Sequence, residues 1–286
     1  MSASAVDRVA VLGAGTMGHG IAQVAALAGA ETVLVDRTRE LVESGLDRVR
    51  ANLDAGVARG KVEPTRRDEA LARLSTATSI EAAARGAQLA VEAVPERMEL
   101  KREVFRTLGA TAPRDAILAT NTSSLSITEI QSGVTRPGRV VGLHFFNPVH
   151  IMKLVEVVRG EQTSPNTVEA AVDWAHRMDK EPIVVRDAPG FASSRLGLAL
   201  GLEAMRMLEA GVASAEDIDT AMTLGYRHPM GPLRLTDLVG LDVRLHVAEY
   251  LHETLGERFR PPDILREKVE RGELGKKSGR GFFDWE

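Results

Sequence analysis

A histidine and a glutamate twelve residues apart are the side chains of this sequence best suited to acid–base chemistry. His144 directly follows an apolar run at 140–143, and Glu156 lies inside a second run at 153–158. A carboxylate in an otherwise apolar strand is costly without a partner, and His144 can be that partner if the two runs pair across a turn at Pro148. An imidazole held in one tautomer by a carboxylate can take up a proton near neutral pH. The pattern predicts a general base, although a lone histidine at a strand end is often structural.

Polar residues also follow two other apolar runs. Glu96 comes just after the run at 88–94, and the cluster 121–124, which includes Ser123, comes just after the run at 116–120. One hydroxyl in this region could cap a short helix, but a cap does not explain four polar residues in succession. Open α/β sheets bind ligands at the carboxyl ends of their strands. We therefore expect Glu96 and Ser123 at the ligand-binding edge of a sheet.

Three glycines near the start of the chain have the spacing of a phosphate-binding turn. An apolar run at 9–12 leads into Gly13, Gly15 and Gly18, and apolar residues at helical spacing follow. In such a strand–turn–helix unit the first glycine makes the tight turn, and the second lets the backbone approach a pyrophosphate. The third lets the helix pack closely, and the helix N-terminus faces the anion.

Asp36 indicates which phosphate compound would bind there. It ends the apolar run at 31–35, 18 residues beyond Gly18, where a carboxylate can accept hydrogen bonds from an adenosine ribose. The same carboxylate would repel a 2′-phosphate, so NAD is expected rather than NADP, and only the neighbouring Arg37 softens this preference. A chance glycine-rich turn, the alternative, would not need an acid at this position.

The alternation of apolar runs and helical patterns predicts an α/β fold: a Rossmann-type doubly wound sheet followed by an all-α C-terminal domain. Pro and Gly residues after Asp187 mark the boundary, because the pattern beyond them is helical. We expect domains at 1–187 and 188–286. Further strands are expected at 116–120, 140–143, 153–158 and 181–186, and helices at 39–59, 68–74, 97–111, 193–210, 230–251, 261–269 and from Ser214.

Composition describes a soluble globular protein and excludes several kinds of site. The 286 residues are 44% hydrophobic and 27% charged, and the net charge of −4 argues against nucleic acid as the main partner. No signal-peptide pattern and no apolar run long enough to span a membrane occurs, so we expect a cytoplasmic protein. The absence of cysteine excludes disulfides, thiolate metal sites and cysteine nucleophiles, and no metal is expected.

Two basic segments could contact an anion. Arg59, Lys61, Arg66 and Arg67 form a local cluster that either holds an anionic part of a substrate or is a solvated loop and helix end. The tail at 275–283 is basic and rich in glycine. We expect this tail to lie outside the core, where it could fold over a ligand.

Several motifs, taken in order, make the chain similar to the L-3-hydroxyacyl-CoA dehydrogenase family, specifically its short bacterial 3-hydroxybutyryl-CoA type. The resemblance runs from about Arg8 to Phe283. It implies NAD as cofactor, oxidation of a 3-hydroxyacyl-CoA to the 3-ketoacyl-CoA in fatty-acid β-oxidation, and a helical C-terminal domain that contacts substrate and forms a homodimer. The motifs are the glycine turn at 13–18, NTSSLSIT at 121–128, HFFNP at 144–148, MKLVE at 152–156, DAPGF at 187–191, MGP at 230–232 and GKKSG at 275–279.

The resemblance also implies roles for individual residues. His144 would be the general base on the C3 hydroxyl, Glu156 would orient it, and Ser123 would donate a hydrogen bond to a substrate oxygen. The cofactor would be lined by Gly13, Gly15, Thr16, Met17, Gly18, Asp36, Glu96, Lys101, Asn147 and Lys277, and Lys61 would contact coenzyme A.

One catalytic position departs from the family pattern. The family usually carries Asn four residues after Gly190, where it helps to position the substrate, and this chain has Ser194 there. Serine is shorter and has one donor instead of two. Either Ser194 acts through a water molecule or the substrate sits differently.

Two other functions stay open. Related gulonate dehydrogenases suggest a free hydroxy acid or sugar acid as the substrate of the same fold. Lens crystallins of this lineage suggest a binding or structural protein without turnover, although intact Ser123, His144 and Glu156 argue against that role.

Overall fold

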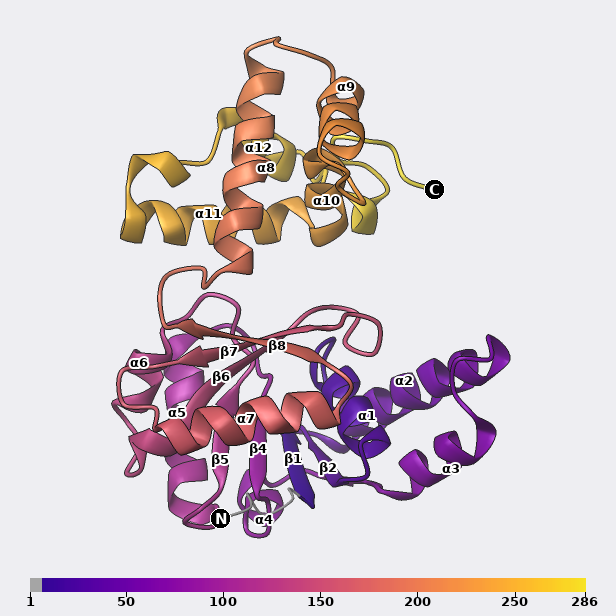
Figure 1. The fold of residues 1–286 in the computed structure, drawn as a ribbon, viewed down its shortest axis with the longest axis vertical. Helices are drawn as coiled ribbons and strands as arrows, with labels where there is room; N and C mark the ends of the chain where they lie inside the picture. Colours follow the sequence, from indigo (N-terminus) through magenta and orange to yellow (C-terminus); the bar gives the residue numbers. More distant parts are fainter. Residues whose placement is uncertain (1–6) are drawn as a thin grey trace. The chain divides into compact units, whose positions relative to one another are not determined.

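The computed structural model describes residues 7–286. Two compact units divide the chain, the first ending at Asp187 and the second comprising Ala188–Glu286. Figure 1 shows that the first unit combines a sheet with helices and that the second is helical. Each unit has its own cluster of buried hydrophobic side chains.

One eight-stranded sheet forms the centre of the first unit. Its strands are β1 (Arg8–Leu12), β2 (Glu31–Val35), β3 (Leu74–Ala77), β4 (Leu89–Glu92), β5 (Ile117–Thr120), β6 (Val140–Phe145), β7 (Leu154–Arg159) and β8 (Glu181–Arg186). They lie in the order β3-β2-β1-β4-β5-β6-β7-β8. The pairs from β3 to β6 are parallel, β7 is antiparallel to β6, and β8 is parallel to β7. The carboxyl ends of β1, β4, β5 and β6 therefore meet at one edge, beside the switch point where ligands bind in such sheets.

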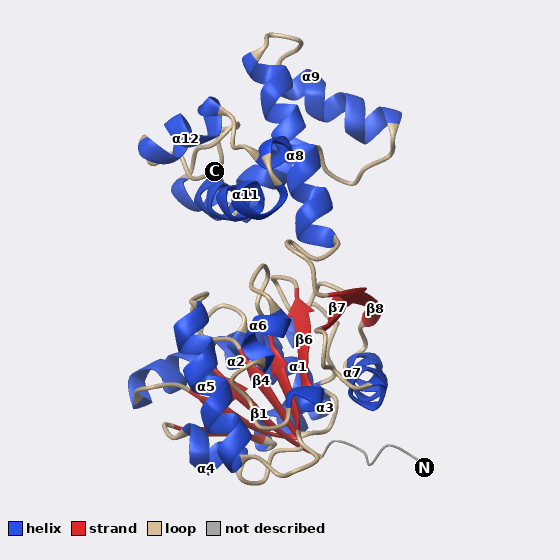
Figure 2. Ribbon diagram, turned by 90° about the vertical axis from the view of Figure 1, so that its left-hand side faces the viewer, coloured by secondary structure: helices blue, strands red, loops and turns tan. Residues whose placement is uncertain are grey.

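Helices cover both faces of the sheet (Figure 1). They are α1 (Gly18–Leu27), α2 (Arg39–Ala58), α3 (Pro64–Ala72), α4 (Ile80–Ala84), α5 (Met98–Thr111), α6 (Ile127–Gln131) and α7 (Pro165–Arg177), with a 3-10 turn, η1, at Pro137–Arg139. In Figure 2 the strands lie between α5 on one side and α7 on the other. Serine hydroxyls cap several of these helices, as Ser126 does by accepting from the Glu129 N–H.

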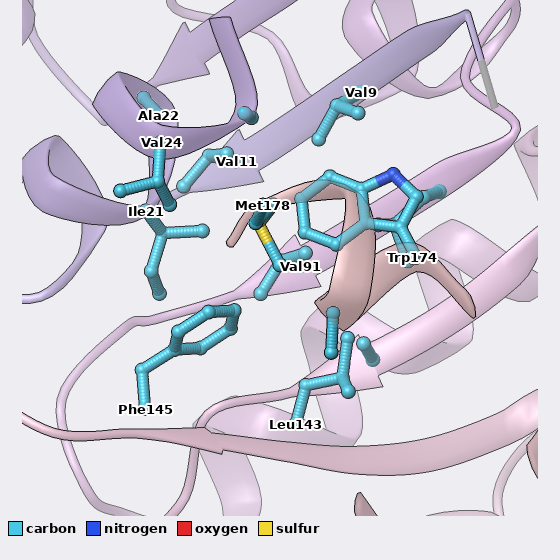
Figure 3. Close-up of a cluster of buried hydrophobic side chains, with 14 of the residues drawn as sticks. Val9, Val11, Ile21, Ala22, Val24, Val91, Leu143, Phe145, Trp174 and Met178 are labelled. Atoms are coloured by element: carbon cyan, nitrogen blue, oxygen red, sulfur yellow. The ribbon is translucent and has the colours of Figure 1, made fainter. Parts of the chain in front are cut away.

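Large apolar side chains fill the space between the sheet, α1 and α7. Figure 3 shows Ile21, Leu143, Phe145 and Trp174 in one cluster. Neighbouring side chains of a strand point to opposite faces, so burying Leu143 and Phe145 in this cluster directs His144 to the other face of the sheet. Burial of each such large side chain is worth about 1.5–3 kcal/mol. The core thus also sets the orientation of the histidine.

The predicted fold class is confirmed, and the strands predicted at 31–35 and 181–186 have those bounds. The helix predicted at 68–74 in fact begins at Pro64, because proline fits the first helical turn without losing a hydrogen bond. The sequence pattern did not predict β3, α4 or α7. These elements are short, partly exposed or without a clean apolar stripe, and tertiary packing supports them.

The second unit consists of helices, with two isolated β-bridges in its tail, Gly275–Arg280 and Arg280–Asp284. The helices are α8 (Ser193–Glu209), α9 (Ala215–Thr220), α10 (Pro232–Val239), α11 (Leu241–Leu255) and α12 (Asp263–Glu270), with a π-helical turn at Ala221–Gly225 and 3-10 turns at Glu257–Phe259 and Lys276–Ser278. The single helix predicted at 230–251 is wrong, since Gly240 adopts a φ of 104° that interrupts it. No helix within residues 7–286 is long and apolar enough to cross a membrane.

The C-terminal tail belongs to the core of the second unit, so the expectation that it lies outside is wrong. Phe283 is buried in the hydrophobic cluster. The fully buried Asp237 carboxylate accepts hydrogen bonds from the backbone N–H groups of Phe282 (2.8 Å) and Phe283 (2.9 Å) and from Nε1 of Trp285 (2.9 Å). A Cβ at Gly281 would lie 2.1 Å from this carboxylate, so glycine permits the close approach. The tail's glycines serve packing.

Candidate active site

His144 and Glu156 face each other as partners in the antiparallel ladder of β6 and β7. His144 Nδ1 lies 2.7 Å from Glu156 Oε2, and the exposed fractions of the two side chains are 8% and 0%. The predicted proximity of these side chains is therefore confirmed. The ring of Phe146 packs at 4.5 Å from the imidazole, centroid to centroid. A buried carboxylate fixes the imidazole and favours a proton on Nδ1, which makes Nε2 the basic nitrogen.

Two polar side chains hold the backbone around this pair. Asn121 Oδ1 accepts a hydrogen bond from the Phe145 N–H at 2.9 Å and so ties the end of β5 to the end of β6. The buried Lys180 ammonium donates to the carbonyls of Val149 (2.5 Å) and Met152 (2.9 Å) in the turn that joins β6 to β7. The turn is thereby anchored to the sheet. Asn121 belongs to the polar cluster 121–124 that the sequence pattern indicated, whereas no pattern pointed to Lys180.

Glu96 organises the loop after β5. Its Oε1 accepts hydrogen bonds from Thr122 Oγ1 (2.5 Å) and from the Ser123 N–H (3.0 Å). Burial opposes ionisation of Glu96, but the nearby Lys101 ammonium and these hydrogen bonds outweigh it and lower its pKa. Glu96 is therefore an ionised acid that positions Ser123 at the carboxyl edge of the sheet.

Lys101 does not present its ammonium to a ligand. Its side chain is 1% exposed, and Nζ lies 2.6 Å from Glu92 Oε1 and 3.2 Å from Glu96 Oε2. Glu92 is fully buried and also accepts from Thr120 Oγ1 at 2.7 Å. Sequence reasoning missed Glu92, although an acid inside an apolar strand is the signal that singled out Glu156.

The geometry of the glycine turn fits a dinucleotide. Gly13 has a φ of 101°, and a Cβ at Gly18 would lie 1.6 Å from the Gly13 carbonyl oxygen, so the turn and α1 can approach this closely only without side chains. Around an ideal Cβ on Gly15, no heavy atom of the described chain lies within 4 Å, which leaves the backbone open to a ligand. Thr16 and Met17 complete the turn.

The N-terminus of α1 is open to an anion. Among residues 7–286, no side chain caps its first turn, and the turn itself contains no acid. Its N–H groups and the helix dipole therefore favour a phosphate. Asp36, at the end of β2, accepts from the Ala14 N–H at 2.8 Å, so its carboxylate is attached to the same turn.

We expect Asp36→Asn to weaken the preference for NAD over NADP by about 10-fold or more, because asparagine keeps an acceptor for the Ala14 N–H but loses the charged acceptor for a ribose. The ratio of kcat/KM for the two cofactors measures this. Asp47→Asn, on the exposed face of α2, is the control. An unchanged ratio in Asp36→Asn would contradict the assignment.

The remaining predicted site residues lie in different places. Asn147 is exposed in the turn after β6. In the second unit, Lys277 Nζ pairs with Asp242 Oδ1 at 2.5 Å, and Ser194 is half-buried in the first turn of α8. No group of three or more His, Cys, Asp and Glu in the part of the chain that the structure describes could hold a metal ion.

Part of the predicted basic cluster lines a cationic pocket in the first unit. Arg67, which was predicted in the same cluster, is not among the residues that line this pocket and forms ion pairs with Asp54 and Asp68. Burial and the neighbouring charges of His19, Lys180 and Arg59 lower the pKa of His150 in this pocket, as expected where positive charge accumulates. The pocket has a volume of about 190 Å³, and its polar lining is Lys61, Arg66, His150, Lys153, Arg177, Asp179 and Lys180.

Comparison with known proteins identifies the family. Residues 8–188 match the NAD binding domain of 3-hydroxyacyl-CoA dehydrogenase and residues 190–285 match its C-terminal domain. A probable 3-hydroxybutyryl-CoA dehydrogenase of Bacillus subtilis is 45% identical over 98% of both chains. The crystal structure of M. tuberculosis FadB2 superposes with a TM-score of 0.95 (41% identity, 99% of this chain and 100% of that one). That of an (S)-3-hydroxybutyryl-CoA dehydrogenase from Ralstonia eutropha superposes with a TM-score of 0.94 (38% identity, 99% and 100%). The chain thus belongs to the 3-hydroxyacyl-CoA dehydrogenase family.

Proposed function

We propose that this protein oxidises (S)-3-hydroxyacyl-CoA, with 3-hydroxybutyryl-CoA as a short-chain substrate, to the 3-ketoacyl-CoA with NAD. The observation that carries the proposal is the buried hydrogen bond between His144 and Glu156 at the carboxyl end of β6. This end lies at the edge of the sheet that also presents Gly13 and Glu96. Relatives at 41–45% identity that are named 3-hydroxybutyryl-CoA dehydrogenase, one of them as probable, support the substrate assignment.

In this proposal His144 Nε2 removes the proton of the C3 hydroxyl, and Glu156 stabilises the imidazolium that forms. NAD, held by the glycine turn and Asp36, would supply the acceptor for the hydride that leaves C3. Ser123 donates a hydrogen bond to a substrate oxygen from a loop that Glu96 holds in place. Ser194 contacts the acyl part of the substrate. In the reverse direction the imidazolium returns the proton.

Cofactor binding is assigned to the glycine turn and its surroundings. Gly13, Gly15, Thr16, Met17 and Gly18 would hold the pyrophosphate, and Asp36 the adenosine ribose. The nicotinamide and its ribose are assigned to Glu96, Asn147 and Lys277. Lys101 is assigned an indirect role through Glu96, because its ammonium is buried.

Coenzyme A is assigned to the cationic pocket. Its phosphates would meet the positive charges of Lys61 and Arg66, beside His150. We also propose a cytoplasmic homodimer formed through the second unit. Exposed apolar side chains of α8, α10 and α11 support this pairing: Leu196, Leu238, Val239 and Val243.

The test is an NADH absorbance assay with 3-hydroxybutyryl-CoA, its S-pantetheine analogue, free 3-hydroxybutyrate and gulonate. We expect turnover of both thioesters, with a higher KM for the analogue that lacks the nucleotide phosphates. Faster turnover of gulonate or of the free acid would favour the sugar-acid function instead. No NADH formation with any of the four would favour a binding protein without catalysis.

A further inference from the structure

Two acids and one lysine form a charged cluster behind the carboxyl edge of the sheet in the first unit. The Lys101 ammonium has two carboxylate partners, Glu92 Oε1 at 2.6 Å and Glu96 Oε2 at 3.2 Å. No other cation among residues 7–286 forms an ion pair with either acid. One ammonium therefore faces two carboxylates, and the cluster carries one excess negative charge. Because Glu92 and Lys101 are fully buried, solvent ions screen this charge only weakly.

Glu92 is the member of this cluster to which the proposed function gives no task. Its carboxylate accepts hydrogen bonds from the Val94 N–H (2.8 Å), from Thr120 Oγ1 (2.7 Å) and from Lys101 Nζ. Burial raises the pKa of Glu92, and the ammonium and these hydrogen bonds oppose that rise. A carboxylate that meets only donors is in the arrangement of an ionised acid. Since Glu92 is 0% exposed, it can influence a ligand only through its charge.

Glu92 lies on the same face of the sheet as His144. Val91 and Leu143 are buried in one hydrophobic cluster, on the face that α1 and α7 cover. Neighbouring side chains of a strand point to opposite faces. Glu92 directly follows Val91 in β4, and His144 directly follows Leu143 in β6. The acid and the imidazole therefore both occupy the other face.

The proposed path of the cofactor passes this cluster. The glycine turn follows β1 and His144 lies on β6, with β4 and β5 between them. At the usual spacing of neighbouring strands, the ends of β1 and β6 are about 14 Å apart. In the proposed function the pyrophosphate binds at the glycine turn and the hydride leaves a carbon beside His144. The nicotinamide would then lie over the ends of β4 and β5, the strands that end in Glu92 and Thr120.

We propose that Glu92 makes the site prefer the oxidised cofactor, because the excess negative charge attracts the nicotinamide cation of NAD and not the uncharged ring of NADH. This inference rests on the proposed function, which puts the nicotinamide beside His144. At the effective dielectric of a partly buried site, one charge changes the binding of another about 10 Å away by about 10-fold. Such a preference favours uptake of NAD and release of NADH, and hence oxidation of the substrate.

The test compares the dissociation constants of NAD and NADH, measured by titration calorimetry without a thioester. Glu92→Gln keeps the shape of the side chain and removes its charge, so it should weaken NAD relative to NADH by about 10-fold. Glu92→Asp keeps the charge and should keep most of the parental ratio, even if both affinities fall. The control is Glu103→Gln, which removes an exposed carboxylate of α5. It should leave the ratio unchanged, because solvent screens that charge.

The outcomes separate this inference from the proposed function. A parental ratio in Glu92→Gln, or the same shift in Glu92→Asp as in Glu92→Gln, would overturn the role of the charge. An NMR titration of the glutamate carboxyl carbons in the unaltered protein tests the inference even if Glu92→Gln does not fold. We expect Glu92 to be ionised at neutral pH, and a protonated Glu92 would overturn the inference. Failure of the unaltered protein to oxidise a 3-hydroxyacyl thioester would instead contradict the proposed function, whatever the ratio.

Discussion

Replacing His144 with glutamine is expected to lower kcat by about 10²- to 10⁴-fold while NAD still binds. Glutamine can donate a hydrogen bond to Glu156 from a similar position but cannot accept the hydroxyl proton at neutral pH. The glycine turn and Asp36 follow β1 and β2, which do not pair with the strand that carries His144, so the affinity for the cofactor should change little. Glu156→Gln should also slow turnover, because it removes the carboxylate that orients the imidazole and stabilises its charged form.

Steady-state kinetics with 3-hydroxybutyryl-CoA and a fluorescence titration with NADH measure the two effects separately. His176→Gln is the matched control, because His176 is exposed on α7. We expect that variant to retain the parental rate. Near-parental oxidation by His144→Gln would show that His144 is not the general base.

The second large effect concerns stability. Asp237→Ala should lower the free energy of unfolding by about 3 kcal/mol or more, because it leaves three N–H donors of the C-terminal tail without their acceptor in a buried place. The tail packs Phe283 into the core of the second unit, so its release also exposes apolar surface. The loss should concern the second unit first, with faster hydrogen exchange in residues 275–286.

Urea unfolding and hydrogen exchange measure this effect. Asp284→Asn removes an exposed carboxylate of the same tail, whose ion pair with Arg280 is long at 3.7 Å, and should change stability by less than about 0.5 kcal/mol. If Asp237→Ala unfolded at the same urea concentration as the parent protein, the carboxylate would not be what holds the tail.

Local sequence patterns were sufficient for most strands and helices of the first unit and for the pairing of His144 with Glu156. Strand β1, Gly13, Gly15 and Gly18 are contiguous, so their geometry follows from the steric needs of one turn. His144 and Glu156 are joined by one short turn, and an acid in an apolar strand must find a nearby partner. Both predictions depend on contacts within one continuous segment, a strand–turn–helix in the first case and a strand–turn–strand in the second.

Only the tertiary structure decided which distant groups meet. The anchoring of the β6–β7 turn by Lys180 joins residues 31 apart in the sequence. The ion pair of Lys101 with Glu92 is nearer in sequence, but it joins a helix to a strand, and no periodic pattern relates the two residues. The tail looked solvated because its composition is basic and rich in glycine, yet Asp237 draws it into the core through hydrogen bonds over more than 40 residues of sequence. The composition of a segment and the spacing of its apolar residues predict which of its own side chains can be buried. Which donors a buried acid satisfies depends on how whole helices pack, and that is set by the fold.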